Sequence, residues 1–377
     1  GFSYFPNNFF EIGMDVFIAN GYASPSFSSE LTTNYDYEVL VHEIGHALGL
    51  KHPFEANGEN IAILSSYEDN TRNTAMSYNE ISTTFDGTPR PLDWMALTQF
   101  YGVKSTYKAG DDGYEFSSSG GTFIIDGAGI DTISAYGTSQ DVTVDLRPGA
   151  HSHLGNKSIY ITDANQLTIS HGSDIENVVT GKGNDIVIGT GLNNNIETGS
   201  GSDTIFAGGG ADTINSGNGA DRIDLSEAVQ ARDIVTLDTF SVDLGADTIY
   251  GFAQGVLGDS FDLTALLNTV FEIFPLVVSG MAPTANFSGG ILRLTGSDVS
   301  TVTDLLSAFK AGGGLDTLSM DSGGSALIIS ANSQATGEDQ SIFAVESSGG
   351  EISIIQLAIL HGNALDIDQW HFDNFIA

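Results

Sequence analysis

The chain has 377 residues, enough for two domains of ordinary size, and 41% are hydrophobic, so a packed core is expected and wholesale disorder is not. The 48 Asp and Glu residues outnumber the 12 Lys and Arg residues, and the net charge of −36 makes nucleic acid and anionic membranes poor partners. The chain contains no cysteine, which excludes disulfides, zinc thiolate sites and cysteine nucleophiles. It also contains no apolar run long enough to span a bilayer. Such acidity fits either a solubility or salt adaptation or a set of sites for hard cations such as Ca²⁺.

Residues 1–105 are predicted to form an α+β domain. Short strands are expected at residues 1–5 and 15–19, and helices at about 37–49 and at 91–101. The second helix has Pro91 in its first turn and Gly102 after its end, which are the preferred residues at these positions.

The first helix carries a pattern of histidines that predicts a catalytic zinc site. His42 and His46 are four residues apart and so share one helix face, and Glu43 is placed to reach a metal-bound water. Gly49 permits a left-handed turn that returns the chain and brings His52 to the same point. HExxH alone recurs by chance in helices, but the full HExxHxxGxxH spacing is much more specific. Three neutral imidazoles leave one coordination position open for water, as in catalytic rather than structural zinc sites.

A second motif strengthens the zinc prediction. Ala75-Met76-Ser77-Tyr78 lies about 25 residues beyond the last histidine and resembles the Met-turn beneath the zinc site of metzincins. A lone Met is usually core filler, and a lone Tyr usually covers an apolar patch. After this histidine motif, we interpret Met76 as the floor of the site and Tyr78 as a phenol close to the metal.

Residues 106–265 are predicted to form an all-β parallel β-roll. Five nine-residue units run without a gap from residue 180 and match the Gly-Gly-x-Gly-x-Asp-x-U-x repeat of Ca²⁺-binding rolls. The glycines allow tight turns, the sixth residue supplies a charged oxygen, and the apolar eighth residue points inward. The sixth positions are Asp185, Asn194, Asp203, Asp212 and Asp221. The eighth positions are Val187, Ile196, Ile205, Ile214 and Ile223.

Each coil of the roll should contain two nonapeptides, so an ion would bridge turns eighteen residues apart. We expect well-occupied sites on the face that presents Asp185, Asp203 and Asp221. The other face presents Glu176, Asn194 and Asp212, and its neutral amide predicts weaker sites or none. The expected calcium ligands are Asp126, Asp131, Gly181, Gly183, Asp185, Gly199, Gly201, Asp203, Gly208, Gly210, Asp212, Gly217, Gly219 and Asp221. The alternative, a calcium-free solenoid, would leave stacked carboxylates to repel one another.

Residues 266–377 are predicted to form a β-rich, β-sandwich-like C-terminal domain related to secretion, with alternating apolar residues at 352–360. No catalytic constellation is visible there, and a carbohydrate- or partner-binding role rests only on the β-rich composition. The last six residues, 372–377, resemble the uncleaved acidic-then-apolar signal of type I secretion substrates, or else they form a docked terminal strand.

Together these motifs resemble the serralysins, secreted zinc metalloproteases of the metzincin group (peptidase family M10B) with an RTX calcium-binding β-roll. The resemblance covers roughly residues 1–265, and the motifs occur in the family's order. Its most specific features are Pro53 directly after the third histidine, Met76-Ser77-Tyr78, the helix with Gln99 and Tyr101-Gly102, and the repeats.

The resemblance implies a role for each residue of the zinc motif. His42, His46 and His52 would bind one catalytic zinc, with Tyr78 as an additional ligand that can swing away to stabilise the transition state. Glu43 would act as general base, so the implied reaction is metal-assisted hydrolysis of peptide bonds in protein or peptide substrates.

The resemblance also concerns the start of the chain. Ser3 and Tyr4 would bind substrate through the edge of the first strand, although an ordinary edge strand ended by Pro6 fits the same residues. Serralysins have a propeptide and earlier strands before this point. We therefore expect that the N-terminal part of the domain has been lost or is bound as a separate cleaved fragment, and that Gly1 is a processed or truncated start.

The function predicted from the sequence is a secreted, calcium-stabilised zinc endopeptidase with one zinc and several calcium ions, for which a proteinaceous inhibitor is a further conceivable partner. An acidic, cysteine-free chain should fold poorly at intracellular calcium levels and fold outside the cell, after type I secretion. The alternative is a non-enzymatic, calcium-dependent binding or adhesion module whose protease domain is truncated.

Overall fold

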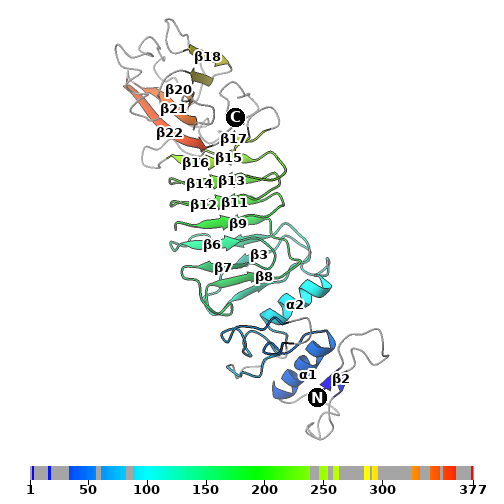
Figure 1. Ribbon diagram of the computed structural model, residues 1–377. Helices are drawn as coiled ribbons and strands as arrows, with labels where there is room; N and C mark the ends of the chain where they lie inside the picture. Colours follow the sequence, from blue (N-terminus) through cyan, green and yellow to red (C-terminus); the bar gives the residue numbers. More distant parts are fainter. Residues whose placement is uncertain are drawn as a thin grey trace. The chain divides into compact units, whose positions relative to one another are not determined.

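The computed structural model describes residues 2–3, 16–17, 34–56, 61–81, 88–237, 246–253, 258–262, 284–288, 291–295, 325–331, 340–348, 351–361 and 375–376 (Figure 1). These residues form mostly strands, with helices α1 and α2 near the N-terminus. They divide into two compact units, Gly1–Ile130 with Arg147–Asp174, and Asp131–Leu146 with Ile175–Ala377. Neither described helix has the length and apolar character needed to cross a membrane.

The first unit contains both helices. β1 (Phe2–Ser3) pairs antiparallel with β2 (Val16–Phe17), within the ranges where strands were predicted. Helix α1 (Asn34–Ala47) begins about three residues before the predicted start and ends at a turn in which Gly49 has a φ of 98°. The remaining described elements of this unit are α2 (Pro91–Tyr101), β3 (Gly113–Glu115), β4 (Thr122–Ile124), β7 (His151–Leu154) and β8 (Gln166–Ile169).

Helix α2 supplies the apolar support beneath the zinc motif. Pro91 opens the helix, as predicted, and Gly102 closes it with a φ of 71°. Leu97 of α2 packs in one buried cluster with Leu50 and Met76, and Trp94 contacts the same cluster. The segment after α1, the Met76 segment and α2 therefore share one core, which fixes the positions of the side chains above it.

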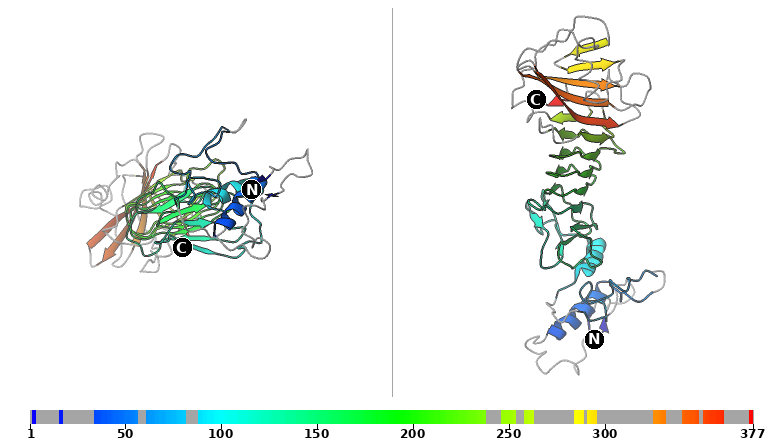
Figure 2. Two further views of the ribbon diagram at one scale, coloured as in Figure 1. Left: turned by 90° about the horizontal axis from the view of Figure 1, so that it is seen from below. Right: turned by 90° about the vertical axis from the view of Figure 1, so that its left-hand side faces the viewer.

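The second unit contains a parallel β-roll made of two sheets of short strands (Figures 1 and 2). One sheet contains β6 (Val142–Asp145), β10 (Ile186–Ile188), β12 (Thr204–Phe206), β14 (Arg222–Asp224) and β16 (Asp247–Tyr250). The other contains β5 (Thr132–Ser134), β9 (Asn177–Val179), β11 (Asn195–Glu197), β13 (Thr213–Asn215), β15 (Ile234–Thr236) and β17 (Ser260–Asp262).

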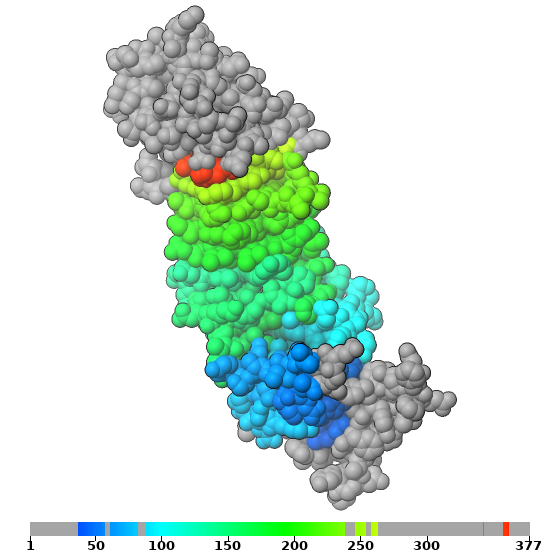
Figure 3. All heavy atoms as spheres, in the orientation of Figure 1, coloured from blue at the N-terminus to red at the C-terminus, as the bar shows by residue number. Residues whose placement is uncertain are grey.

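The core of the roll is a column of aliphatic side chains from the eighth repeat position. Val187, Ile205 and Ile223 lie opposite one another in register and are completely buried. Ile196 and Ile214 are paired and buried in the same way in the second sheet. In the space-filling view the coils, drawn in green, lie directly against one another (Figure 3). The predicted nine-residue register of a parallel roll is thus confirmed.

The roll continues beyond the repeats into the C-terminal strands. The alternating stretch at 352–360 forms β22 (Glu351–His361), which adds parallel to β16. β22 also pairs antiparallel with β21 (Gln340–Ser348), which is followed in the sheet by β20 (Ser325–Ala331), β19 (Ile291–Thr295) and β18 (Thr284–Ser288). β23 (Phe375–Ile376) pairs parallel with β17, which fits the alternative of a docked strand for these two residues.

Candidate zinc site and calcium-binding roll

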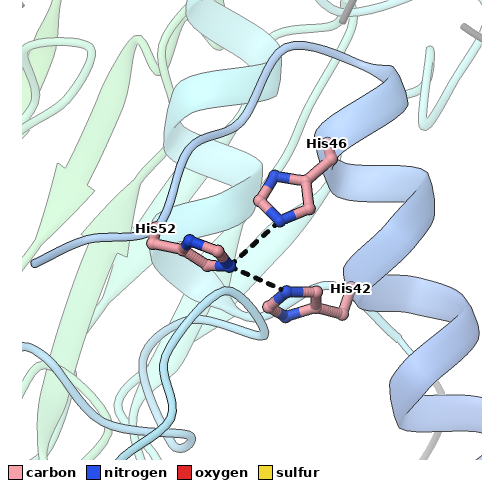
Figure 4. A group of neighbouring side chains, drawn as sticks. All are labelled: His42, His46 and His52. Atoms are coloured by element: carbon pink, nitrogen blue, oxygen red, sulfur yellow. Dashed lines mark hydrogen bonds between the residues drawn. The ribbon is translucent and has the colours of Figure 1, made fainter. Parts of the chain in front are cut away.

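Three imidazoles converge on one point in the first unit (Figure 4). His42 and His46 project from one face of α1, and His52 projects from the segment that folds back after Gly49. The Nε2 atom of His52 lies 3.2 Å from Nε2 of His42 and 3.1 Å from Nε2 of His46. A tetrahedral zinc ion with Zn–N bonds of about 2.0–2.1 Å would hold its ligand atoms at roughly this separation.

The opposite nitrogen of each ring fixes which nitrogen carries the proton. Nδ1 of His42 lies 2.8 Å from the Ala75 carbonyl oxygen, and Nδ1 of His46 lies 2.8 Å from the Leu50 carbonyl oxygen. Nδ1 of His52 lies 3.1 Å from the Glu55 carboxylate. Because each Nδ1 must donate to its oxygen, each Nε2 of the neutral rings presents a lone pair to the other two. Three lone pairs directed at one point repel unless a cation lies between them, so this donor set fits zinc.

Burial favours the neutral form of His42, the first of these ligands. It lowers the pKa of His42, and the neighbouring His46 and His52 lower it further, although the bond to Ala75 and the charge of Glu43 oppose the shift. A neutral imidazole is the form that binds a metal ion.

Glu43 and Tyr78 lie beside the three histidines, as the motif predicts. The Tyr78 hydroxyl is 2.8 Å from Nε2 of His52, although 65% of its side chain is exposed. Burial and the charges of Glu55 and Glu43 raise the pKa of Tyr78, which keeps the phenol protonated. Glu43 is buried, and it lines a cavity of about 400 Å³ together with His42 and Tyr78. The Glu43 carboxylate, the Tyr78 phenol and the His42 imidazole therefore line the same cavity.

Met76 lies under α1, as predicted for the floor of the site. It is 2% exposed and packs with Leu50 and Leu97. Its sulfur approaches Gly45 so closely that a Cβ atom on this glycine would lie 2.5 Å from Sδ. A larger residue at position 45 would therefore force the packed Met76 side chain to move, which favours glycine there although glycine is a weak helix former.

Sequence reasoning missed Asp93, which links α2 to the zinc site. Its buried carboxylate accepts hydrogen bonds from the Thr74 hydroxyl at 2.5 Å and from the Ala75 and Arg90 amides at 2.8 Å. Burial raises its pKa, and these hydrogen bonds oppose the shift. The carbonyl of the same Ala75 accepts the Nδ1 proton of His42. An acidic residue in the first turn of a helix predicts capping, but nothing local predicts the link to residue 75.

The repeat carboxylates form a ladder along one side of the roll. The backbone amides of Asp185 and Asp203 each donate, at 2.8 Å, to the Oδ1 atom of the aspartate eighteen residues later. The amide of Asp221 then donates to Asp247 at 3.1 Å. The second carboxylate oxygens of Asp203 and Asp221 are buried and accept no hydrogen bond within the described residues. Such oxygens fit calcium, which binds six to eight oxygen ligands.

Without a cation, ionisation of the buried aspartates in this ladder destabilises the folded state. Burial is the main cause that raises the pKa of Asp203 to about 7 and that of Asp247 to about 8. Neighbouring carboxylates raise both values further, whereas hydrogen bonds to backbone and side chains lower them. Burial also raises the pKa of Asp221.

The second ladder has a neutral amide instead of a carboxylate at Asn194, where weaker calcium binding is predicted. The Asn194 amide nitrogen donates to the Glu176 carbonyl at 3.0 Å, and its oxygen accepts from the Thr190 amide at 2.8 Å. Both ends of this side chain are thus satisfied by the protein itself. The backbone hydrogen bonds continue through it, because the amide of Asn194 donates to Asp212 at 2.7 Å, that of Asp212 to Asp233, and that of Asp233 to Asp259. Burial and nearby carboxylates raise the pKa of Asp212 to about 8.

Sequence reasoning named neither Asp233, Asp247 nor Asp259 as a ligand. The ladder steps that reach these residues span 21 or 26 residues instead of 18, so they leave the strict repeat. In the sequence, Asp247 occupies the sixth position of one isolated nonapeptide match at residues 242–250, away from the five consecutive units.

The remaining predicted site residues are placed as follows. Six of the eight predicted repeat glycines have φ between 79° and 153°: Gly199, Gly201, Gly208, Gly210, Gly217 and Gly219. A Cβ on Gly181 or Gly183 would meet the backbone of residues 138–141. Asp126 belongs to the first unit, where it accepts hydrogen bonds from Tyr114 and Ala128, whereas Asp131 belongs to the second. Ser3 lies in β1, and Tyr4 falls outside the described residues.

Comparison with known proteins gives two matched segments. Residues 14–90 match reprolysin-like metallopeptidases of family M12B, and residues 188–223 match four copies of the RTX calcium-binding nonapeptide repeat. The first match implies zinc and the second implies calcium.

Several curated relatives are proteases. The serralysin of Proteus mirabilis is 34% identical over 188 residues, which are 43% of this chain and 37% of that protein. Serralysin C of Dickeya chrysanthemi is 30% identical over 214 residues, which are 50% and 42% of the two chains. The metallopeptidase AprA of Pseudomonas marginalis is 29% identical over 214 residues, which are 49% and 43%. The alignments thus span less than half the length of these relatives. The chain combines a metallopeptidase-like segment with RTX repeats, and about half of it or less aligns with these serralysins.

Proposed function

We propose that this chain is a secreted, calcium-stabilised zinc endopeptidase that hydrolyses peptide bonds in proteins. The observation that carries the proposal is the convergence of three Nε2 atoms beside a buried glutamate and a tyrosine hydroxyl. The metallopeptidase match and the serralysin relatives support it.

In this proposal His42, His46 and His52 hold the zinc ion. When bound, Zn²⁺ supplies Lewis acidity, which makes water a nucleophile near neutral pH and polarises a carbonyl group. Glu43 accepts the proton of the attacking water at its carboxylate and passes it to the leaving amine. The Tyr78 hydroxyl donates a hydrogen bond to the oxygen that becomes negative in the transition state.

We also propose the wider setting of this activity. The N-terminal unit would have a metzincin-like α+β fold, and the C-terminal strands would form a sandwich-like domain. Calcium ions held by the repeat aspartates would stabilise the roll outside the cell, after type I secretion, and a proteinaceous inhibitor is a further partner. Asp126 and Asp131 would contribute to calcium binding, and Ser3 and Tyr4 to substrate binding.

A binding or adhesion module without activity is the second candidate, but no observation favours it. A decayed protease would be expected to lose Glu43 or a histidine first, and all four are present and grouped.

Casein hydrolysis by the purified chain, verified by intact mass and supplied with calcium, tests the proposal. We expect activity that a zinc chelator abolishes and that added zinc restores. Glu43→Ala should keep one zinc per chain and lose almost all turnover, because it removes the proton acceptor but none of the metal ligands. Near wild-type activity of Glu43→Ala would show that the role assigned to Glu43 is wrong, and absence of any hydrolysis by zinc-loaded wild type would favour the binding module.

A further inference from the structure

The cavity beside the zinc site has an acidic lining. It measures about 400 Å³ and is lined by residues of α1 and of the segment 75–80. Helix α1 contributes Glu38, Val39, His42 and Glu43, and the segment contributes Ala75, Ser77, Tyr78 and Glu80. Since His42, Glu43 and Tyr78 belong to the zinc site, whatever enters this cavity lies directly beside the reacting bond.

Glu38 and Glu80 are the residues of this lining that the proposed reaction does not use. They come from the two segments that line the cavity, and burial, together with the charge of Glu80, raises the pKa of Glu38. Arg90 acts on Glu38 in the opposite direction. The proposed zinc ion offsets the charge of Glu43, so Glu38 and Glu80 are the carboxylates of the lining that are left to attract a cation. A cation between Glu38 and Glu80 would remove their mutual repulsion.

We propose that this cavity takes a cationic side chain, lysine or arginine, of the substrate residue next to the bond that is cut, and that Glu38 and Glu80 select it. This inference rests on the proposed protease function. Val39 lies in the same lining and offers an apolar contact to the methylene groups of such a side chain. Acidic side chains would be rejected, because a carboxylate beside Glu38 and Glu80 adds like-charge repulsion.

The charge of the whole chain also attracts cationic peptides, so the experiment must separate attraction to the molecule from selection by the cavity. A net charge of −36 raises the encounter rate with any basic peptide, wherever its positive charge lies. Selection by the cavity instead depends on the position of the charge relative to the cut bond. It should also persist at high salt, since Debye screening at about 0.5 M removes interactions beyond roughly 4 Å but not contacts inside a cavity.

The experiment uses the full chain with zinc and calcium and a series of otherwise identical peptides. One residue beside the cleavage site, identified by mass spectrometry, is Lys, Arg, Leu or Glu, and in a further peptide the Lys is moved four positions away. We expect kcat/KM to be about tenfold higher for Lys or Arg than for Leu, and lower still for Glu, in about 0.5 M NaCl. Glu38→Gln and Glu80→Gln should each reduce the Lys-to-Leu ratio severalfold. Glu115→Gln removes the same charge from an exposed position on β3 and should leave the ratio unchanged.

Each result has a definite meaning. If the peptides are cleaved but Lys and Leu give equal kcat/KM, or if the displaced Lys works equally well, the inference is wrong while the protease function stands. If zinc-loaded wild type cleaves no peptide and no casein, both are overturned. The wild-type series measures the preference without any variant, so a variant that fails to fold does not remove the test.

Discussion

Each imidazole of the zinc site is oriented by an oxygen from a different part of the chain. The Ala75 carbonyl fixes His42, the Leu50 carbonyl fixes His46, and the Glu55 carboxylate fixes His52. Oxygen partners of this kind set the tautomer and the direction of a metal-binding histidine. The precision of the site thus depends on residues that never contact the metal, and Asp93 is the buried one that holds Ala75.

Asp93→Asn tests this dependence. The amide has one oxygen where the carboxylate has two, and its NH₂ group would face a donor, so one of the Thr74, Ala75 and Arg90 hydrogen bonds is lost. We expect a loss of about 1–3 kcal/mol in stability and weaker zinc binding, since His42 loses its fixed acceptor. Thermal unfolding followed by circular dichroism and zinc titration measure the two effects. The exposed Glu115→Gln serves as control, and unchanged zinc affinity in Asp93→Asn would contradict the positioning role.

For Gly45→Ala we predict a change in folding stability opposite in sign to the change that helix propensity alone predicts. In an exposed helix this change stabilises by roughly 1 kcal/mol. Here the added Cβ would lie 2.5 Å from the Met76 sulfur, inside a packed core, so we expect a destabilisation of about 1–3 kcal/mol. Denaturant unfolding of the single variants and of Gly45→Ala/Met76→Ala forms a double-mutant cycle. The double variant should cost less than the sum of the two, and additivity would show that the contact is unimportant.

At the scale of elements, local spacing predicted much of the structure. The helix at Pro91–Tyr101, the three converging histidines and the column at Val187, Ile205 and Ile223 all follow from patterns within a few residues or from a strict repeat. The ladder beyond residue 223 did not, because insertions lengthen its steps to 21 and 26 residues. The Asp93 link joins α2 to residue 75, which lies 18 positions earlier and outside any helix or strand, so no sequence period reveals it.

The second ladder has a neutral amide at Asn194 where the first ladder has carboxylates, and Asn194→Asp tests the effect of this difference. Asn194 donates to the Glu176 carbonyl, and an aspartate would place a carboxylate against that oxygen. Without calcium we expect a loss of about 1–3 kcal/mol in stability. With saturating calcium we expect the loss to be reversed and the second ladder to bind more calcium, because the new carboxylate supplies a ligand.

Calcium counts from native mass spectrometry and titration calorimetry measure this change. Asp203→Asn is the matched exchange on the first ladder and should reduce the calcium count there. Equal calcium occupancy of both ladders in the wild-type chain at limiting calcium would contradict the predicted asymmetry.

At the scale of the whole molecule, the acidity of the chain is partly internal. Asp185, Asp203, Asp212, Asp221 and Asp233 are each at most 2% exposed, although carboxylates are usually at the surface. Buried charges of one sign require a counter-charge, and no lysine or arginine occupies the ladder positions. Folding of the second unit is therefore expected to be coupled to calcium, which would stabilise a chain that has no disulfides.

The raised pKa values predict the pH dependence of the calcium-free chain. Asp203, Asp212 and Asp247 have pKa values of about 7, 8 and 8 in the folded state, against 3.8 as the ordinary value. Between about pH 4 and pH 8 the folded state therefore binds more protons than the unfolded state, and stability falls as the pH rises. In a chelator such as EDTA, we expect a higher unfolding temperature at about pH 5 than at about pH 8. With calcium the order should reverse, because the ion binds ionised carboxylates and stabilises the folded state by mass action.

Asp247→Asn should raise the unfolding temperature in EDTA at about pH 8 and weaken its dependence on pH, since it removes one buried charge. A calcium-free chain that is most stable at about pH 8 would show that the ladder carboxylates carry no such penalty.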